Sequence, residues 1–282
     1  MRRTNPGVVY CSISDFGSGP GADLPGYNVL VQAVGGLMSI TGQAGGPPTK
    51  VGVALVDVLT SKDPVIEVLA ALAARERDGH GQHIEVNLLS NLLAALVNQA
   101  SADLWTGRAP VRLGNQHPSI APYETLRCRD GLIAICCGND GQFRRCVTVL
   151  GKPGLADDPR FTTNADRVVH RSDVIAELES PAGRRHRRLL DRTAHRSRVP
   201  AGKVGDLADA FALAERLGLA PTVPVGPIMF RRSGIRSATP APPSPATVLL
   251  PAWGEHTEEI RRWFATGRTS RLPHPARTAS RA

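Results

Sequence analysis

The stretch PGYNVLVQAVGGLMSITG (residues 25–42), followed closely by VGVALVDVLTS (residues 51–61), decides how this chain folds. The first string has helical apolar spacing, so we expect a helix that is interrupted at Gly35 and Gly36. One carboxylate, Asp57, stands in the otherwise apolar second string. An unpaired buried carboxylate is so costly that it is normally neutralised, paired or kept for chemistry. On spacing alone a helix N-cap, a core acid paired with an arginine, and a nucleophile all stay open for Asp57.

Strands and helices are expected to alternate on both sides of this stretch. Short β-branched runs predict buried strands, and helical apolar spacing that ends in a charged turn and a glycine predicts helices. The expected strands are residues 8–14, 83–89 (a strand or the start of a helix) and 132–139, and the expected helices are residues 27–40, 65–82, 90–105 and 140–151, with one more late in 157–180. The glycine-rich residues 16–26 follow the first strand, where α/β proteins place ligands. This order predicts an α/β fold, and residues 138–143 are expected to form a tight strand-to-helix turn.

The composition is that of a globular protein. The chain has 282 residues, 41% of them hydrophobic, which is enough for a sizeable core. No apolar run is long enough for a membrane span and no signal peptide is recognisable, so a cytoplasmic location is expected. The five cysteines are odd in number and irregularly spaced, so we expect reduced thiols and neither a disulfide framework nor a zinc site.

The net charge of +9 is concentrated in one segment. Residues 184–198, RRHRRLLDRTAHRSR, hold seven arginines against one aspartate. With only 4% aromatic residues in the chain, stacking platforms for nucleic acid are few. A solvated helix face is the expected role, and no nucleic-acid or membrane partner is predicted.

Several ordered blocks carry a more specific signal. They are NPGVVYCSISDFG, PGYNVLVQAVGGLMSITG, GPPTKVGVALVDVLTS, ALAARERDGHGQHIEVNLLS, RLGNQHPSIAPYETLRCRDGLIAICCGNDGQFRRCVTVLG and LADDPRFTTNADRVVHR. Together they resemble the class III coenzyme A transferase family (CaiB/BaiF type), which includes formyl-CoA transferase, carnitine-CoA transferases and alpha-methylacyl-CoA racemase. The resemblance is continuous from about Asn5 to Arg171 and returns near residues 199–219 and 254–260.

The resemblance implies a role for four residues. Asp57 would be the nucleophile that attacks an acyl-CoA thioester and forms a mixed anhydride, and Gly26, Tyr27 and Asn28 would line the thioester pocket. The expected function is therefore transfer of CoA from an acyl-CoA to a carboxylic acid. CoA enters as part of the substrate, and no metal or separate cofactor is expected. Neither the donor nor the acceptor acid is specified by these residues.

Tyr27 separates the two chemistries of the family. Racemase members carry a histidine at this place, because proton exchange next to the thioester needs a base whose pKa lies near working pH. Tyrosine has a reference pKa of about 10 and suits that task poorly. Transferase is thus preferred to racemase.

The resemblance also implies the architecture. It predicts the remainder of a Rossmann-like large domain, a smaller α/β domain joined to it by long linkers, and an interlocked homodimer. The predicted parts are the large domain with the nucleophile (1–105), a linker (106–122), the smaller domain (123–250), a C-terminal helix returning to the large domain (251–266) and a disordered tail (267–282).

Three departures from the family pattern leave an alternative open. The chain is expected to lack the N-terminal part that family members carry before this block, and Ser61, Lys62, Asp63 and Pro64 replace the usual apolar helix start. The resemblance also vanishes in the arginine-rich segment, which we interpret as a short out-of-frame translation of an amphipathic helix. The alternative is a truncated, non-catalytic remnant or a partner-binding subunit.

Overall fold

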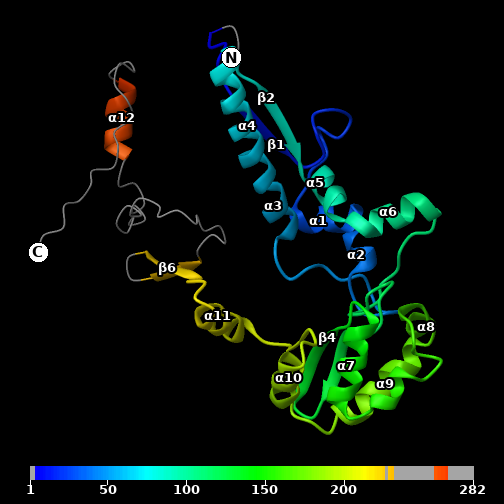
Figure 1. The fold of residues 1–282 in the computed structure, drawn as a ribbon. Helices are drawn as coiled ribbons and strands as arrows, with labels where there is room; N and C mark the ends of the chain where they lie inside the picture. The colour runs from blue at the N-terminus through cyan, green and yellow to red at the C-terminus, as the bar shows by residue number, and fades with distance from the viewer. Residues whose placement is uncertain (1–3, 226–227, 232–256, 266–282) are drawn as a thin grey trace, which may run out of the picture. The chain divides into compact units, whose positions relative to one another are not determined.

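The computed structural model describes residues 4–225, 228–231 and 257–265 (Figure 1). The chain divides into two compact units, residues 1–204 and residues 205–282. Helices and strands alternate along the first unit, which confirms the α/β fold class. Within the described ranges, every helix is too short or too polar to cross a lipid bilayer.

Two parallel strands organise the N-terminal part of the first unit. Strand β1 (Tyr10–Ser14) pairs with β2 (His83–Asn87) over their full length. The connection between them contains helices, as a parallel pair requires. The helices of this part are α1 (Asn28–Val34), α2 (Leu37–Ile40), α3 (Leu55–Thr60), α4 (Lys62–Asp78), α5 (Leu88–Ala95) and α6 (Val97–Thr106). The long helix α4 runs alongside both strands in Figure 1 and packs against β2.

The strand at residues 8–14 was expected to be buried, and that expectation is wrong for its two largest apolar side chains. Tyr10 is 45% exposed and Ile13 is 56% exposed. Among the described residues β1 belongs to a sheet of only two strands, so little of the structure is available to cover its side chains.

The local signals for helix ends are confirmed. The break between α1 and α2 falls at the two adjacent glycines, where Gly36 has a φ of 86°. Helix α4 ends at Gly79 in the left-handed region, and Pro64 lies in its first turn, where proline is tolerated. The expected single helix over residues 90–105 is instead two helices, because the backbone turns at Val97, whose φ is 36°.

The second part of the first unit is an antiparallel sheet with helices. Its strands are β3 (Tyr123–Cys128), β4 (Gly131–Cys136) and β5 (Ala201–Lys203), in that spatial order. The helices are α7 (Asp140–Leu150), the short 3-10 helix η1 (Pro153–Ala156), α8 (Asn164–Val169), α9 (Arg171–Ala182) and α10 (Arg187–Arg196). Side chains from β3, β4, α7, α9 and α10 share one apolar core that includes Leu126, Ile133, Phe143 and Leu178.

Residues 107–122 connect the two parts without regular secondary structure. The end of this connection is held by two arginines. Arg171 donates to Glu124 at 2.7 Å and to two carbonyl groups of the connection. The fully buried Arg167 donates to the carbonyl of Ala121 at 2.7 Å. The charged groups of α8 and α9 therefore anchor the connection to the second part.

The arginine-rich segment forms an amphipathic helix, α10. Leu190 and Ala194, four residues apart, are buried in the core of the second part. Arg188, Arg192 and Arg196 lie exposed at the same four-residue spacing, and none has an ion pair within the described part of the chain. A solvated helix face is thus found, and the out-of-frame origin stays a prediction that sequencing of the locus tests.

The second unit contains α11 (Leu207–Arg216), the antiparallel pair β6 (Thr222–Val225) and β7 (Ile228–Arg231), and α12 (Thr257–Ala265). The predicted domain boundaries stay predictions. The expected tail at 267–282 and residues 232–256 lie outside the described residues.

Candidate active site

Asp57 lies in the first turn of α3 and is exposed to solvent. Of the three roles left open for Asp57, a core acid paired with an arginine is excluded, for a reason of helix geometry. Val56 and Thr60, four residues apart, turn the same face of α3 into the interior. Asp57 is one residue on from Val56, which rotates its side chain about 100° away from that face. Across the described residues, the Asp57 carboxylate has neither a hydrogen bond nor an ion pair.

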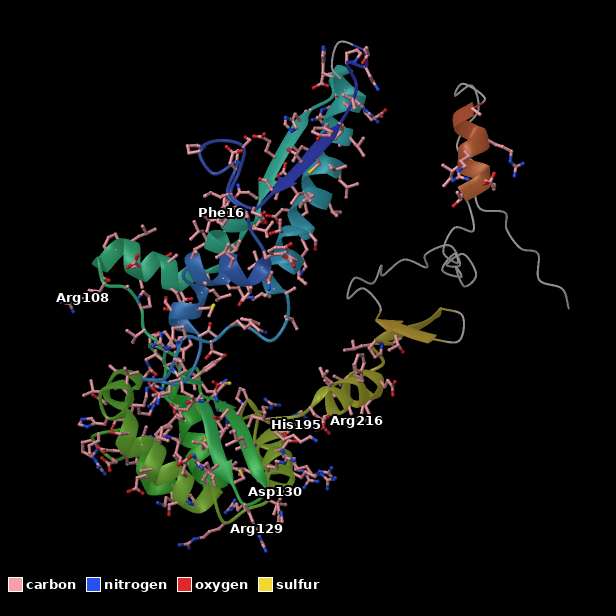
Figure 2. All side chains as sticks on the ribbon, turned by 180° about the vertical axis from the view of Figure 1, so that it is seen from behind. Phe16, Arg108, Arg129, Asp130, His195 and Arg216 are labelled. Atoms are coloured by element: carbon pink, nitrogen blue, oxygen red, sulfur yellow. The ribbon has the colours of Figure 1, made fainter. Side chains whose placement is uncertain are left out.

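An apolar core packs against the buried face of α3, the face that carries Val56. Val31 of α1, Val56 of α3, and Leu88 and Leu92 of α5 form one buried cluster. Phe16, labelled in Figure 2 near the end of β1, packs against the same cluster. Helices α1, α3 and α5 therefore meet under the candidate nucleophile.

Gly26 is held close to the end of β1. A Cβ atom at Gly26 would lie 2.4 Å from the Cβ of Asp15, so no larger residue fits there without movement. The backbone of Asp15 in turn accepts a hydrogen bond from the N–H of Leu89 in α5 at 3.1 Å. Gly26 thus allows the glycine-rich loop to close onto the carboxyl end of the sheet, where α/β proteins bind ligands.

Tyr27 and Asn28 differ in what they contact. Tyr27 precedes α1 in an extended conformation, and its side chain is 80% exposed. Asn28 is half-buried, and its Oδ1 accepts a hydrogen bond from the N–H of Val56 at 3.1 Å. The structure therefore brings Asn28 to the residue next to Asp57.

Sequence reasoning missed Gln32. Its side chain is fully buried, and its Oε1 accepts from the N–H of Val51 at 2.9 Å. The available signal was a single amide in the apolar string NVLVQAV, four residues after Asn28 and therefore on the same helix face.

The predicted turn before α7 is confirmed. Asn139 caps that helix, and its side chain accepts from the N–H of Gln142 at 2.9 Å. The described residues contain no group of three or more His, Cys, Asp or Glu side chains that could hold a metal ion.

The sequence is similar to that of known CoA-transferases. The sequence model of CoA-transferase family III matches residues 1–222. A succinate–glutarate CoA-transferase of Agrobacterium fabrum is 43% identical over 213 residues, which is 75% of this chain and 53% of that protein. An acetyl-CoA:oxalate CoA-transferase of Acetobacter aceti is 38% identical over 217 residues, which is 76% of this chain and 56% of that protein. The chain spans about half the length of these two relatives.

The chain also resembles a solved structure. The crystal structure of a CaiB/BaiF family protein from Brucella suis matches with a TM-score of 0.79 and 39% sequence identity. The match covers 93% of this chain and 69% of that one.

Proposed function

The chain belongs to CoA-transferase family III, and on this premise we propose that it moves CoA from an acyl-CoA thioester to a carboxylic acid, with Asp57 as nucleophile. The supporting observation is the state of the Asp57 carboxylate. It is exposed, it is unpaired among the described residues, and it stands on a helix whose base is packed against α1 and α5. An exposed aspartate is ordinarily a solvated surface charge, so exposure permits this role and family membership gives the reason for it.

The first half of the reaction loads CoA onto the enzyme. A carboxylate oxygen of Asp57 attacks the thioester carbon, the C–S bond breaks, and CoA leaves as a thiolate, which is a good leaving group. The product is a mixed anhydride between Asp57 and the acyl group. The thiolate then attacks the Asp57 carbonyl carbon, the C–O bond breaks, and the donor acid leaves as a carboxylate.

The second half reverses these steps with a different acid. The acceptor carboxylate attacks the Asp57–CoA thioester and releases the thiolate, which then attacks the acceptor's carbonyl carbon in the new anhydride. The acyl-CoA product departs and Asp57 regains its carboxylate. The intermediates retain the free energy of the thioester only while water, which would hydrolyse them, is excluded.

We propose small dicarboxylic acids as substrates. Both bacterial relatives are named for them, glutarate and succinate in one case and oxalate in the other. Of the thioester-pocket residues, Gly26 supports the close approach of the loop, Tyr27 presents an exposed ring at its end, and Asn28 lies beside α3. Racemisation is less well supported, since an exposed tyrosine stands where that chemistry needs a base.

A homodimer in the cytoplasm completes the proposal. Helix α4 exposes Val65, Ile66 and Leu69, each about three-fifths exposed. Exposed apolar side chains gathered on one element are typical of association surfaces. No metal and no cofactor besides the CoA of the substrate is proposed.

A transfer assay tests the function. Succinyl-CoA and glutarate are incubated with the protein, and glutaryl-CoA is followed by mass spectrometry. We expect transfer by the wild type and at least a roughly 1,000-fold loss in Asp57→Asn. The matched control is Asp63→Asn, an exposed aspartate in the first turn of α4, which should keep the activity. Equal transfer by Asp57→Asn would refute the role of Asp57, and a folded wild type without any transfer would favour the non-catalytic alternative.

A further inference from the structure

Two side-chain amides on α1 hold the segment that leads to Asp57. The N–H of Val51 donates to Gln32 Oε1 at 2.9 Å, and the N–H of Val56 donates to Asn28 Oδ1 at 3.1 Å. Gln32 Nε2 donates to the same Asn28 Oδ1 at 3.3 Å. One continuous hydrogen-bonded chain therefore joins both ends of residues 51–56 to a single helix.

The orientation of both amides follows from the donors. A backbone N–H can only donate, so the group that faces it must be the amide oxygen. Both Asn28 and Gln32 meet a backbone N–H with their oxygen, which leaves the Gln32 nitrogen to donate to Asn28. Asn28 Oδ1 then uses both of its lone pairs within the protein. That oxygen is engaged in holding the backbone and is not available to a substrate.

Helix α3 needs such support because it is short and poorly capped. It has six residues, and its N-cap is Ala54, whose side chain offers no hydrogen bond. A helix this short is unstable by itself, and its first N–H groups lack partners within the helix. The Val56 N–H is one of these groups, and Asn28 supplies its partner from α1. Gln32 accepts from the Val51 N–H, which precedes α3, and it does so from full burial, where an amide moves little.

We propose that Asn28 and Gln32 are positioning residues that fix residues 51–56 and thereby keep the Asp57 carboxylate in place during acyl transfer. In the proposed reaction the Asp57 side chain changes from a carboxylate to an anhydride and then to a CoA thioester, so its size and charge change twice. The first turn of α3 must hold its direction through these changes. This inference rests on the proposed nucleophilic role of Asp57.

The variants separate the hydrogen bonds from the side-chain volume. Asn28→Leu and Gln32→Met keep approximate size and remove the amide. Asn28→Asp retains an oxygen that accepts from both Val56 and Gln32, and it serves as the rescue for the exchange of the Val56 amide. The control is Asn115→Ala, an exposed residue whose amide donates to the hydroxyl of Thr125 at 3.1 Å.

Hydrogen exchange and single-turnover kinetics are measured on the full chain. In Asn28→Leu the Val56 amide should exchange at least about 5-fold faster than in the wild type, as expected for one lost hydrogen bond. The rate of acyl-enzyme formation from succinyl-CoA should fall about 10- to 100-fold in Asn28→Leu and Gln32→Met. The succinyl-CoA concentration that gives half of the maximal rate should change less than about 3-fold. The exchange rate of the Val56 amide in Asn28→Asp should stay within about 5-fold of the wild type, and Asn115→Ala should match the wild type in both measurements.

The outcomes are distinguishable. If Asn28→Leu does not fold, Gln32→Met gives the comparison, with exchange followed at the Val51 amide, whose hydrogen bond that variant removes. A faster Val56 exchange with an unchanged acyl-enzyme rate would overturn the positioning role and leave Asp57 as nucleophile. A folded wild type that forms no acyl-enzyme would refute the proposed function first, and the positioning role with it.

Discussion

Replacing Arg167 by methionine should strongly destabilise the second part of the first unit. The guanidinium is fully buried and donates to the carbonyls of Ala121 and Phe161 at 2.7 and 2.8 Å. It also pairs with Asp140 at 2.7 Å and lies 4.3 Å from the ring centre of Phe143. Methionine fills much of the volume of the arginine side chain, but it can neither donate these hydrogen bonds nor form the ion pair.

The magnitude follows from the groups left without a partner. Ala121 and Phe161 are both fully buried, so their carbonyl groups lose a hydrogen bond that water cannot replace. Each such loss costs about 1–3 kcal/mol. The Asp140 side chain is 60% exposed and regains water, so it adds little. The expected loss in the free energy of unfolding is therefore about 4 kcal/mol.

Arg160 provides a matched control. It pairs with Asp158 at 2.8 Å and lies 4.7 Å from the ring centre of Phe161, so it shares the carboxylate and aromatic contacts of Arg167 but not its bonds to buried carbonyl groups. Its side chain is 47% exposed. Exposed pairs contribute about 0–1 kcal/mol, so Arg160→Met should cost no more than that.

Native-state hydrogen exchange measures the difference. The amides of Ile133 and Ile135 lie in the central strand β4 and report the opening of this core. A loss of about 4 kcal/mol raises their exchange rates about 1,000-fold, since each 1.4 kcal/mol is a factor of ten. Arg160→Met should raise them less than about 10-fold. Equal effects of the two variants, or less than a 10-fold effect of Arg167→Met, would refute the reasoning.

Three further perturbations probe other parts of the chain. Arg192→Gln removes the like charge between Arg188 and Arg196 and should stabilise α10 by about 0.5 kcal/mol at low salt, measured by thermal unfolding, with the gain vanishing in high salt. The backbone N–H of the first residue of α10 holds the pKa of Asp130, labelled at the β3–β4 turn in Figure 2, below its usual range. The stability that Asp130 contributes is thus complete above its unfolded pKa of about 4 and is lost as pH falls through the lower folded value, so Asp130→Asn should flatten the acid limb of the unfolding curve; an unchanged limb would contradict this. A hydrogen bond that the Cys137 thiol donates to Cys146, together with burial, raises the pKa of Cys137. Iodoacetamide at about pH 8 should therefore modify this thiol only as the protein unfolds, and rapid labelling of the native chain would be the contrary result.

Local signals predicted most of the helices. The glycines after α4 and α7 end those helices in the left-handed region, with φ values of 74° for Gly79 and 80° for Gly151. Such signals act within a few residues, so the sequence contains them in full. Strand β3 was not predicted as an element because its residues continue a polar, proline-containing stretch, and its pairing with β4 decides its conformation.

Long-range contacts limited the prediction of the site. Asp57 stands among apolar residues, but which of them are buried depends on how α1 and α5 pack against α3. The bond between Asn28 and Val56 joins residues 28 positions apart, and no local pattern specifies it. The role proposed for Asp57 comes from a resemblance, whereas its exposure to solvent and the hydrogen bonds that hold the start of α3 required the structure.

Mass spectrometry of a trapped intermediate tests the central claim most directly. The protein is incubated with succinyl-CoA, treated with hydroxylamine, digested and analysed for a hydroxamate, with Asp57→Ala as the comparison. The account predicts a hydroxamate on Asp57 in the wild type and none in the variant. A folded wild type without any adduct, or an adduct that persists in Asp57→Ala, would contradict it.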